Sequence, residues 1–348
     1  MTPTRRLCIA MLALVWLAGS AAPVLAINSR AGTSGAQFLK LGAGSRAGAM
    51  GEAYTAVTDD VYAVYYNPAA LTELTGPQLG AAHTSYFQDL SYEFAAFAYP
   101  IGPVRAMTET VVSTMTSAGP STMTVRVPAA VAEFSRHAVG VAIYNLSIDD
   151  IERRNSDTPS NIGTFSAGDN AYALSYAYRF DRTLGAGVTG KYIHQKIDTY
   201  NADAFAMDAA VLYRPYPNAR RPFSFAGVIK NLGTRPSFAG VSDPLPLGIT
   251  LGAGFQPIAK RVKVDLDLNK YRDTDPFVTL GGEYTHPFAP GVSGALRAGF
   301  SSHRIENEGF NEISVGAGIN FHRAAFDFAW VPFGALGNTF RYALLLKF

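Results

Sequence analysis

Cysteine and charge are scarce in this sequence. The 348 residues include one cysteine, Cys8, which excludes a disulfide framework and a cysteine-based zinc site. Charged residues make up 16% of the chain, against about 25% in an ordinary soluble domain, while hydrophobic residues make up 48%. This composition is too apolar for a disordered protein. The formal net charge of +2 argues against a general nucleic-acid-binding protein.

Long hydrophobic runs are also missing after the first 30 positions. A membrane-spanning helix needs about 20 consecutive apolar residues, so the pattern argues against a helical membrane protein. Residues 1–26 have the features of a secretory signal peptide, with Arg5 and Arg6 ahead of an apolar stretch and a small-residue cleavage site ending at Ala26. We therefore expect an exported chain that begins at residue 27.

From about residue 78 onward the sequence alternates with a period of two, which is the pattern of β-strands. At the end of the chain, large apolar residues at even positions alternate with Arg341 and Lys347 at odd positions. The second face of these strands carries mostly Gly, Ala, Ser and charges of both signs, whereas a soluble β-sandwich would carry many Lys and Glu there. Apolar residues outside and small or polar residues inside are typical of a transmembrane β-barrel, which leaves no unpaired backbone groups in lipid.

The alternation predicts fourteen antiparallel strands closed into this barrel, which occupies residues 78–348. They are expected at about 78–87, 90–99, 138–149, 168–180, 183–196, 204–214, 222–231, 247–256, 261–269, 277–285, 291–300, 311–321, 324–331 and 338–348. The connections alternate between short ones and mostly longer ones, including 150–167 and 197–203, which we expect on the extracellular side. Residues 105–136 do not fit; a hairpin insert, an additional strand pair and disorder all remain open.

Residues 27–77 do not alternate and are rich in glycine and tyrosine. Asn67 followed by Pro68 predicts the start of a short helix, with Asn67 as its N-cap. Leaving four tyrosines of this stretch in water would be costly, so we expect it to form a plug, or hatch, inside the lumen rather than a periplasmic tail. Asp59 and Asp60 are candidates for cation binding or for gating this hatch, although such a pair more often caps a turn.

Two stretches resemble a known family. The run Phe38–Tyr54, with Asp59, Asp60 and the following Tyr66–Leu71, is similar to the start of PorV/PorQ proteins, and Trp330–Arg341 is similar to their last loop and final strand. The family belongs to the broader FadL superfamily of outer-membrane barrels. The resemblance implies a fourteen-stranded barrel with an N-terminal hatch in the outer membrane of a Gram-negative bacterium. By superfamily resemblance, Asn67, Pro68 and Ala69 lie near the ligand region.

The strand pattern also assigns residues to the lumen and to barrel assembly. A mixed-charge interior is expected from Lys191, Lys263, Asp265, Asp267, Glu283, Arg297, Asp327, Arg341 and Lys347. These charges form either a polar path and hatch-holding network or simply pairs that neutralise one another. The alternating end, Tyr342, Leu344, Leu346 and Phe348, resembles the signal that the barrel assembly machinery recognises.

The sequence offers little chemistry for catalysis. The six histidines lack the spacing of a metal pair, and no nucleophile elbow occurs. We therefore expect no metal, no cofactor and no enzymatic activity. Two functions remain: passive transport of a hydrophobic small molecule, as the FadL superfamily implies, and an accessory role in type IX-like secretion, as PorV implies. The first needs an apolar pocket near the hatch, and the second needs exported proteins or a secretion channel as partners.

Overall fold

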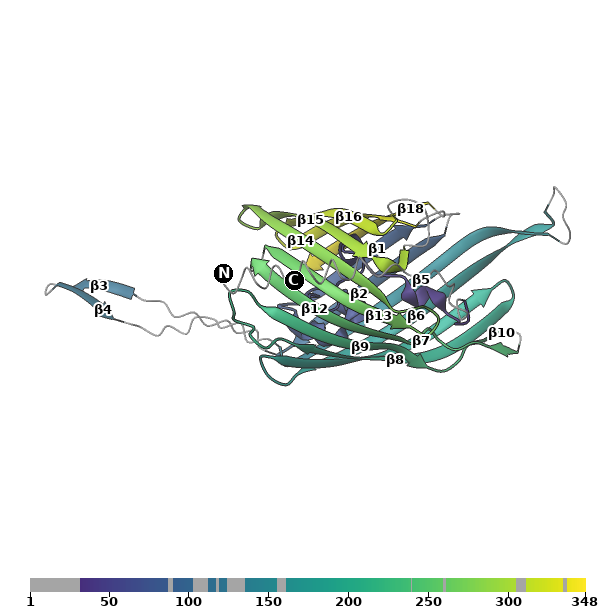
Figure 1. Cartoon of the computed structure of the whole chain (residues 1–348), viewed down its shortest axis with the longest axis horizontal. Helices are drawn as coiled ribbons and strands as arrows, with labels where there is room; N and C mark the ends of the chain where they lie inside the picture. Colours follow the sequence, from purple (N-terminus) through teal and green to yellow (C-terminus); the bar gives the residue numbers. More distant parts are fainter. Residues whose placement is uncertain are drawn as a thin grey trace.

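The protein folds into a closed barrel of fourteen antiparallel strands (Figure 1). The computed structural model describes residues 32–86, 90–102, 112–116, 119–123, 135–154, 161–238, 240–258, 261–304, 311–333 and 337–348. The signal peptide expected at 1–26 lies outside these residues. Each strand pairs with its neighbours along the chain, and β1 (Gln78–Ser85) pairs with β18 (Asn338–Lys347) to close the wall.

All fourteen predicted strands are present, with boundaries within a few residues of those expected. The remaining strands of the wall are β2 (Ser91–Ile101), β5 (His137–Arg153), β6 (Gly163–Arg179), β7 (Leu184–Ile197), β8 (Tyr200–Tyr213), β9 (Phe223–Gly233), β12 (Gly248–Ile258), β13 (Val262–Tyr271), β14 (Phe277–Ala289), β15 (Val292–Ser301), β16 (Ile313–Phe321) and β17 (Ala324–Pro332).

The bounds predicted for two of the longer loops are wrong. Residues 150–153 belong to β5 and residues 163–167 to β6, and the paired ends of these strands project beyond the rest of the wall as a long hairpin (Figure 1). Strand pairing also continues to Ile197 and Tyr200, so the connection between β7 and β8 is only the turn Asp198-Thr199. Polar side chains do not prevent backbone pairing, because the ladder needs only N–H and C=O groups. A polar stretch can therefore continue a hairpin beyond the apolar wall.

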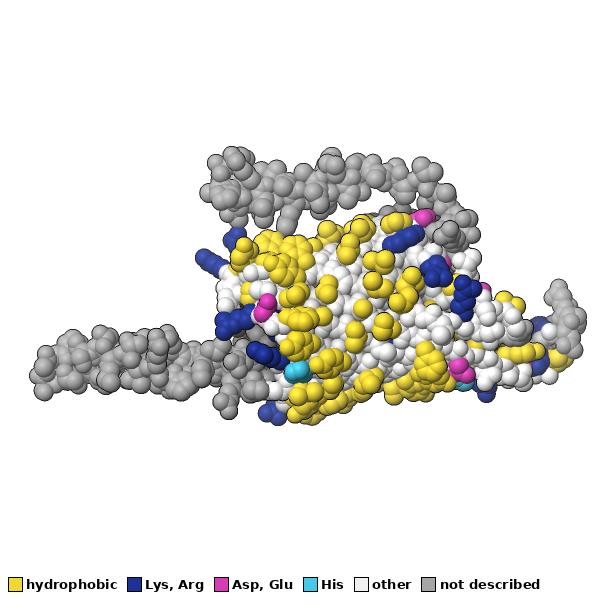
Figure 2. All heavy atoms as spheres, turned by 90° about the horizontal axis from the view of Figure 1, so that it is seen from below, with side chains coloured by type: hydrophobic (Ala, Val, Ile, Leu, Met, Phe, Trp, Pro, Cys, Tyr) yellow, Lys and Arg dark blue, Asp and Glu magenta, His cyan; other side chains and the backbone are white. Residues whose placement is uncertain are grey.

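Burial along the strands separates an outer face from an inner face. Large apolar side chains alternate with buried small or polar ones, and Leu174 and Leu296 on the outer face are 64% and 66% exposed. Figure 2 shows one side of this wall, with hydrophobic side chains spread over its middle and charged ones towards its ends. Tyr342, Leu344 and Phe348 are exposed on the outer face, and Leu346 is partly exposed. This is the wall of a transmembrane barrel.

Short elements complete the structure outside the wall. In the region 105–136, β3 (Val112–Thr116) and β4 (Gly119–Met123) pair with each other in a separate two-stranded sheet. The small pair β10 (Ser237–Phe238) and β11 (Val241–Ser242) lies between β9 and β12, and the 3-10 helix η3 (Ser302–Arg304) follows β15.

Residues 32–77, called the inner segment here, lie within the barrel. This segment contains η1 (Gln37–Lys40), α2 (Ser45–Ala49), α3 (Ala63–Tyr66) and η2 (Pro68–Glu73). The α2 helix contacts β15 to β18, whereas η2 contacts β5 to β8, so the segment spans the lumen from wall to wall. Its tyrosines are buried, including Tyr54 and Tyr66. None of the described helices is long and apolar enough to cross a bilayer.

Inward-facing glycines of the wall allow the inner segment to approach the strands closely. A Cβ placed on Gly187 would lie 2.4 Å from the backbone nitrogen of Ala69, and one placed on Gly299 would lie 2.0 Å from the nitrogen of Gly51. Both distances are too short for a non-bonded contact between a carbon and a nitrogen atom. Glycine is therefore required at these positions by backbone-to-backbone packing.

A pair of substitutions within β7 tests this packing. We expect Gly187→Ala to destabilise the folded barrel by about 1–3 kcal/mol, because the added methyl group overpacks the contact with η2. Gly190→Ala is the matched control, since a Cβ there would meet nothing within 4 Å. Urea unfolding in detergent micelles, followed by the change in gel mobility of the folded barrel, measures both. Equal midpoints for the two variants would contradict the close packing.

Candidate functional site: a charged chamber at one end of the lumen

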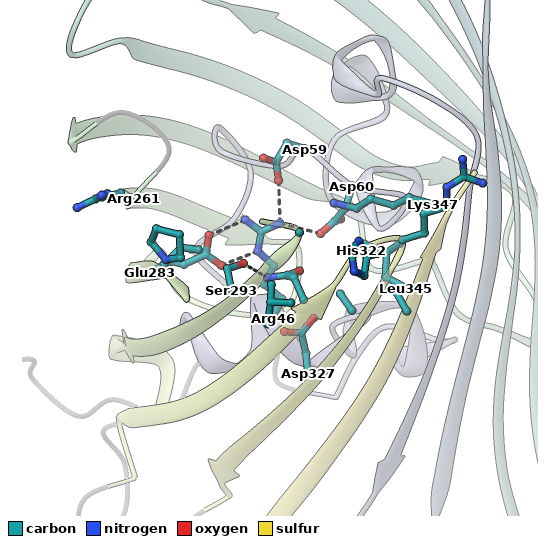
Figure 3. A pocket seen from close by; sticks show the side chains of 18 of the residues that line it. Arg46, Asp59, Asp60, Arg261, Glu283, Ser293, His322, Asp327, Leu345 and Lys347 are labelled. Carbon is teal, nitrogen blue, oxygen red and sulfur yellow. Dashed lines mark hydrogen bonds and ion pairs between the residues drawn. The ribbon is translucent and has the colours of Figure 1, made fainter. Parts of the chain in front are cut away.

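A chamber of about 510 Å³ opens at the end of the barrel that carries the connections 259–261, 290–291 and 322–323. The inner segment contributes Arg46, Asp59 and Asp60 to its wall, and strands β12 to β18 with their connecting turns contribute the rest (Figure 3). Its charged lining side chains are Arg46, Arg261, Lys263, Arg297, Arg323, Lys347, Asp59, Asp60, Glu283 and Asp327. The chamber therefore has a mixed-charge lining, with positive and negative side chains side by side.

Arg46 is the centre of the chamber (Figure 3). Its Nε and Nη2 atoms donate to the two carboxylate oxygens of Glu283, both at 2.7 Å, and its Nη1 donates to Asp59 at 2.7 Å and Asp60 at 3.0 Å. The guanidinium also lies over the Tyr54 ring, 5.2 Å from the ring centre. A planar fork of donors suits this bidentate arrangement, which lysine could not reproduce.

Short helix α2 positions Arg46 because small residues surround it in the sequence. Ala47 and Gly48 follow it, and a Cβ on Gly48 would lie 2.8 Å from an Arg341 nitrogen. The helix can therefore sit directly against the inner face of β18. Arg341 itself donates to Glu52 of the inner segment at 2.5 Å, which gives a second ion pair between segment and wall.

The ion-pair network continues along the wall on both sides of Arg46. Glu283 also accepts from Arg297 at 2.6 Å, and Arg297 donates to Asp327 at 2.6 Å. On the other side Lys263 donates to Asp59. Opposite charges of the wall strands and of the inner segment thus neutralise one another, as buried charges must. Five of the predicted lumen residues, Lys263, Glu283, Arg297, Asp327 and Lys347, are brought together around this chamber.

The two neighbouring carboxylates of the inner segment have different environments. Burial by itself raises the pKa of Asp59, but the positive charges of Lys263 and Arg46 outweigh it, and the pKa lies well below its usual range. For Asp60, burial together with the negative charge of Asp59 outweighs Arg46 and raises the pKa. Asp60 also accepts from the Tyr54 hydroxyl at 2.7 Å and the Tyr62 backbone N–H at 3.1 Å.

Asp265 and Asp267 lie deeper in the lumen, where they bind the backbone of the inner segment. Asp267 accepts from the N–H groups of Tyr54 and Thr55, both at 3.1 Å, and from the Thr55 hydroxyl at 2.7 Å. Asp265 accepts from the N–H of Ala56 at 3.0 Å. These carboxylates satisfy backbone donors of a segment that has little regular structure there.

The other predicted residues occupy separate positions. Lys191 of β7 pairs with Asp208 of β8 at 2.6 Å, inside the lumen but across the barrel from the chamber. Asn67 caps η2 by accepting from the N–H of Ala69 at 3.1 Å, and its amide donates to the Thr55 carbonyl at 2.8 Å. Pro68 and Ala69 pack on Gly187. Asn67, Pro68 and Ala69 therefore connect the inner segment internally and to β7, away from the charged chamber.

Sequence reasoning missed Arg46, Glu52, Glu73 and Lys230. Glu73, at the end of η2, pairs with Arg179 at 2.5 Å and with Arg214. The ammonium of buried Lys230 lies 4.4 Å from the centre of the Tyr65 ring, a cation–π contact. The available signal for Arg46 was a single charge within the run of Gly and Ala at 42–49. A charge that interrupts such a tightly packed stretch needs a partner across the interface.

No metal-binding group of three or more His, Cys, Asp or Glu side chains occurs in the part of the chain that the structure describes.

No protein-family model matches the chain, and neither does any curated protein. Solved structures do match. The Pseudomonas putida toluene transporter TodX superposes with a TM-score of 0.51 and 10% identity over 87% of this chain and 96% of that one. A Pseudomonas aeruginosa FadL homologue gives 0.50 and 11%, over 88% and 98%.

The chain has a FadL-type barrel fold. The likeness is confined to the fold, since so few residues are identical. Together with the apolar outer wall, this FadL-type architecture places the protein in the outer membrane of a Gram-negative bacterium.

The different pKa directions of Asp59 and Asp60 predict opposite pH effects on stability. Asp59 stabilises the fold only while ionised, so its contribution is present above its unfolded pKa of about 3.9 and is lost as the pH falls further. Asp60 has a raised folded pKa, so its ionisation costs stability as the pH rises through that value. Relative to wild type, Asp59→Asn should therefore become less destabilising below about pH 4.

For Asp60→Asn we expect the opposite trend. As the pH falls towards about 4, wild-type Asp60 becomes protonated and the wild-type protein gains stability, so the destabilisation caused by Asp60→Asn increases. Urea unfolding of the three proteins in detergent at a series of pH values measures the differences. Parallel curves for Asp59→Asn and Asp60→Asn would show that the two carboxylates are not held in different environments.

Proposed function

We propose that this protein is a passive outer-membrane transporter of hydrophobic small molecules, in which the inner segment acts as the hatch. The observation that carries this proposal is a lumen crossed by a folded segment that is fixed to the wall at separate points. Asp265 and Asp267 hold residues 54–56, and Arg46 holds Glu283. Glu73 holds Arg179 of β6 and Arg214, which directly follows β8. A folded segment across the lumen blocks free passage, so a ligand would cross the barrel only when part of this segment moves.

The fold likeness supports the same reading. One neighbour carries the name of a toluene transporter, and a mutant of it with a TM-score of 0.53 is described as a monoaromatic hydrocarbon channel. The charged chamber is not the apolar pocket that such a ligand needs. We therefore assign the chamber to holding the hatch rather than to binding the ligand, because its central charges are already paired with one another.

A reversible lock tests whether the hatch moves. A Cβ on Gly252 would lie 3.1 Å from the Cβ of Thr55, so the two positions must separate by about 0.4 Å to reach the usual spacing of a disulfide. The only natural cysteine, Cys8, lies in the expected signal peptide, so Thr55→Cys with Gly252→Cys creates a unique pair. We expect cells with the oxidised double variant to take up the hydrophobic dye N-phenylnaphthylamine more slowly than cells with wild type, and a reductant to restore the rate.

The two single-cysteine variants are the controls for the substitutions themselves. If dye uptake is the same in cells with and without the wild-type barrel, the transport proposal fails. If uptake depends on the barrel but the oxidised and reduced double variants are equal, transport stands and movement of residue 55 is not part of it.

A second candidate is a PorV-like accessory of protein secretion. The observation that favours it is the β5–β6 hairpin, whose 17-residue strands project beyond the wall (Figure 1). The projecting end of β5 carries Asp149, Asp150, Glu152 and Arg153. A projecting hairpin offers a docking surface that a small-molecule transporter does not need. Arg153, the last residue of β5, pairs with Asp198 of the neighbouring β7–β8 turn at 2.6 Å.

A pull-down from native outer membranes tests this candidate. Recovery of exported proteins that share one C-terminal domain with wild type, and their loss when residues 152–163 are removed, is the expected result of a secretion role. Removal of the small β10–β11 hairpin, residues 237–242, is the control for disturbing a loop at the same end. Recovery of the barrel alone would exclude the secretion accessory.

A further inference from the structure

A groove of about 390 Å³ lies on the outer face of the wall, across strands β18, β1, β2 and β5, with Phe326 of β17 at one edge. Its floor is formed by Ala81 and Ala95, which face each other across β1 and β2. Leu344 flanks Ala81 on β18, and Ile143 flanks Ala95 on β5. Two small side chains between larger ones make a depression in a surface that otherwise carries large apolar residues.

One end of the groove is polar. The row next to the alanines consists of Tyr342, His83, Glu93 and Asn145, which are register partners on the same four strands. His83 and Glu93 contact each other at 2.5 Å, and the His83 ring stacks with Tyr342 at 6.4 Å between ring centres. These side chains point outwards, with His83 45% and Glu93 50% exposed. A charged group on the lipid-facing side of a barrel is costly unless a polar partner meets it.

The polar row continues around the wall. Asn145 pairs with Asn170 at 2.8 Å, and Asn170 is the register partner of His194, which in turn contacts Asp203 at 2.8 Å. Beyond this row, away from the alanines, the outer face of β1, β2 and β5 carries Ser85, Ser91 and Ser147. The row therefore separates an apolar surface from a polar one, and the groove crosses this boundary.

We propose that the groove binds one acyl lipid of the surrounding outer membrane. Its acyl chain lies over Ala81 and Ala95, and the polar linkage or head group hydrogen-bonds His83 and Glu93. The direction of the groove supports this assignment. On all four strands the apolar residue lies on one side and the polar residue on the other, along the strand direction, which matches the polarity of a lipid standing in a leaflet. Leu79 and Phe97, in the next row, end the apolar half.

The full-length barrel, extracted from vesicles of phosphatidylethanolamine and phosphatidylglycerol, provides the test. Native mass spectrometry in a mild detergent counts the lipids that remain on each barrel. We expect one lipid to stay on wild type, and the fraction of lipid-bound barrel to fall about tenfold in Ala95→Leu, because leucine fills the floor of the groove. The matched control is Ala253→Leu, an exposed outward-facing alanine of β12 on another part of the wall.

A second variant removes the polar end. His83→Phe combined with Glu93→Leu keeps an apolar outer face and should also lose the lipid. If Ala95→Leu does not fold, as judged by gel mobility, Ala81→Leu fills the same floor from the neighbouring strand. Equal lipid retention by wild type, the floor variants and Ala253→Leu, or no lipid on wild type, would overturn the proposal and leave only non-specific annular lipid.

Discussion

Contact between the inner segment and the barrel wall is the interaction on which the rest of the structure depends. A fourteen-stranded wall encloses more space than its own small inward side chains can fill. The inner segment fills that space, and inward glycines such as Gly187 and Gly299 let its backbone touch the strands directly. The hydrophobic effect and dispersion stabilise this contact over its whole area, whereas ion pairs stabilise it at a few points. The small residues of the inner face are therefore as important to the fold as the large residues of the outer face.

Charges within the lumen have a structural role that follows from this contact. Each of Arg46, Glu52 and Glu73 pairs with a residue of the wall, and Asp265 and Asp267 pair with backbone N–H groups of the segment. Removal of one partner would leave a buried charge uncompensated, which typically costs about 3–5 kcal/mol. The polar attachments of the inner segment are thus ion pairs and hydrogen bonds, which add to its packing against the wall.

The two ends of the barrel differ in what they offer to other molecules. One end has a charged chamber, in which the paired residues lie at the centre and Arg261, Arg323 and Lys347 line the mouth. The other end has the projecting β5–β6 hairpin. The outer wall adds a third surface, the groove with His83 and Glu93 at its polar end. A transporter needs the lumen, a secretion accessory needs the hairpin, and both need a wall that is compatible with lipid.

The sequence by itself determined the barrel. At 338–348 and 172–180, large apolar residues alternate with small or polar ones. This alternation predicts which side chains face outwards and which face inwards, because successive side chains of a strand point to opposite sides. The start of the short helix after Asn67 was also readable, because capping is a local interaction. Only the tertiary structure decided the partners of the lumen charges. Arg46 and Glu283 are 237 residues apart, and no local rule relates them. The same holds for the outer groove, since Ala81 and Ala95 become one floor only through the register of β1 with β2.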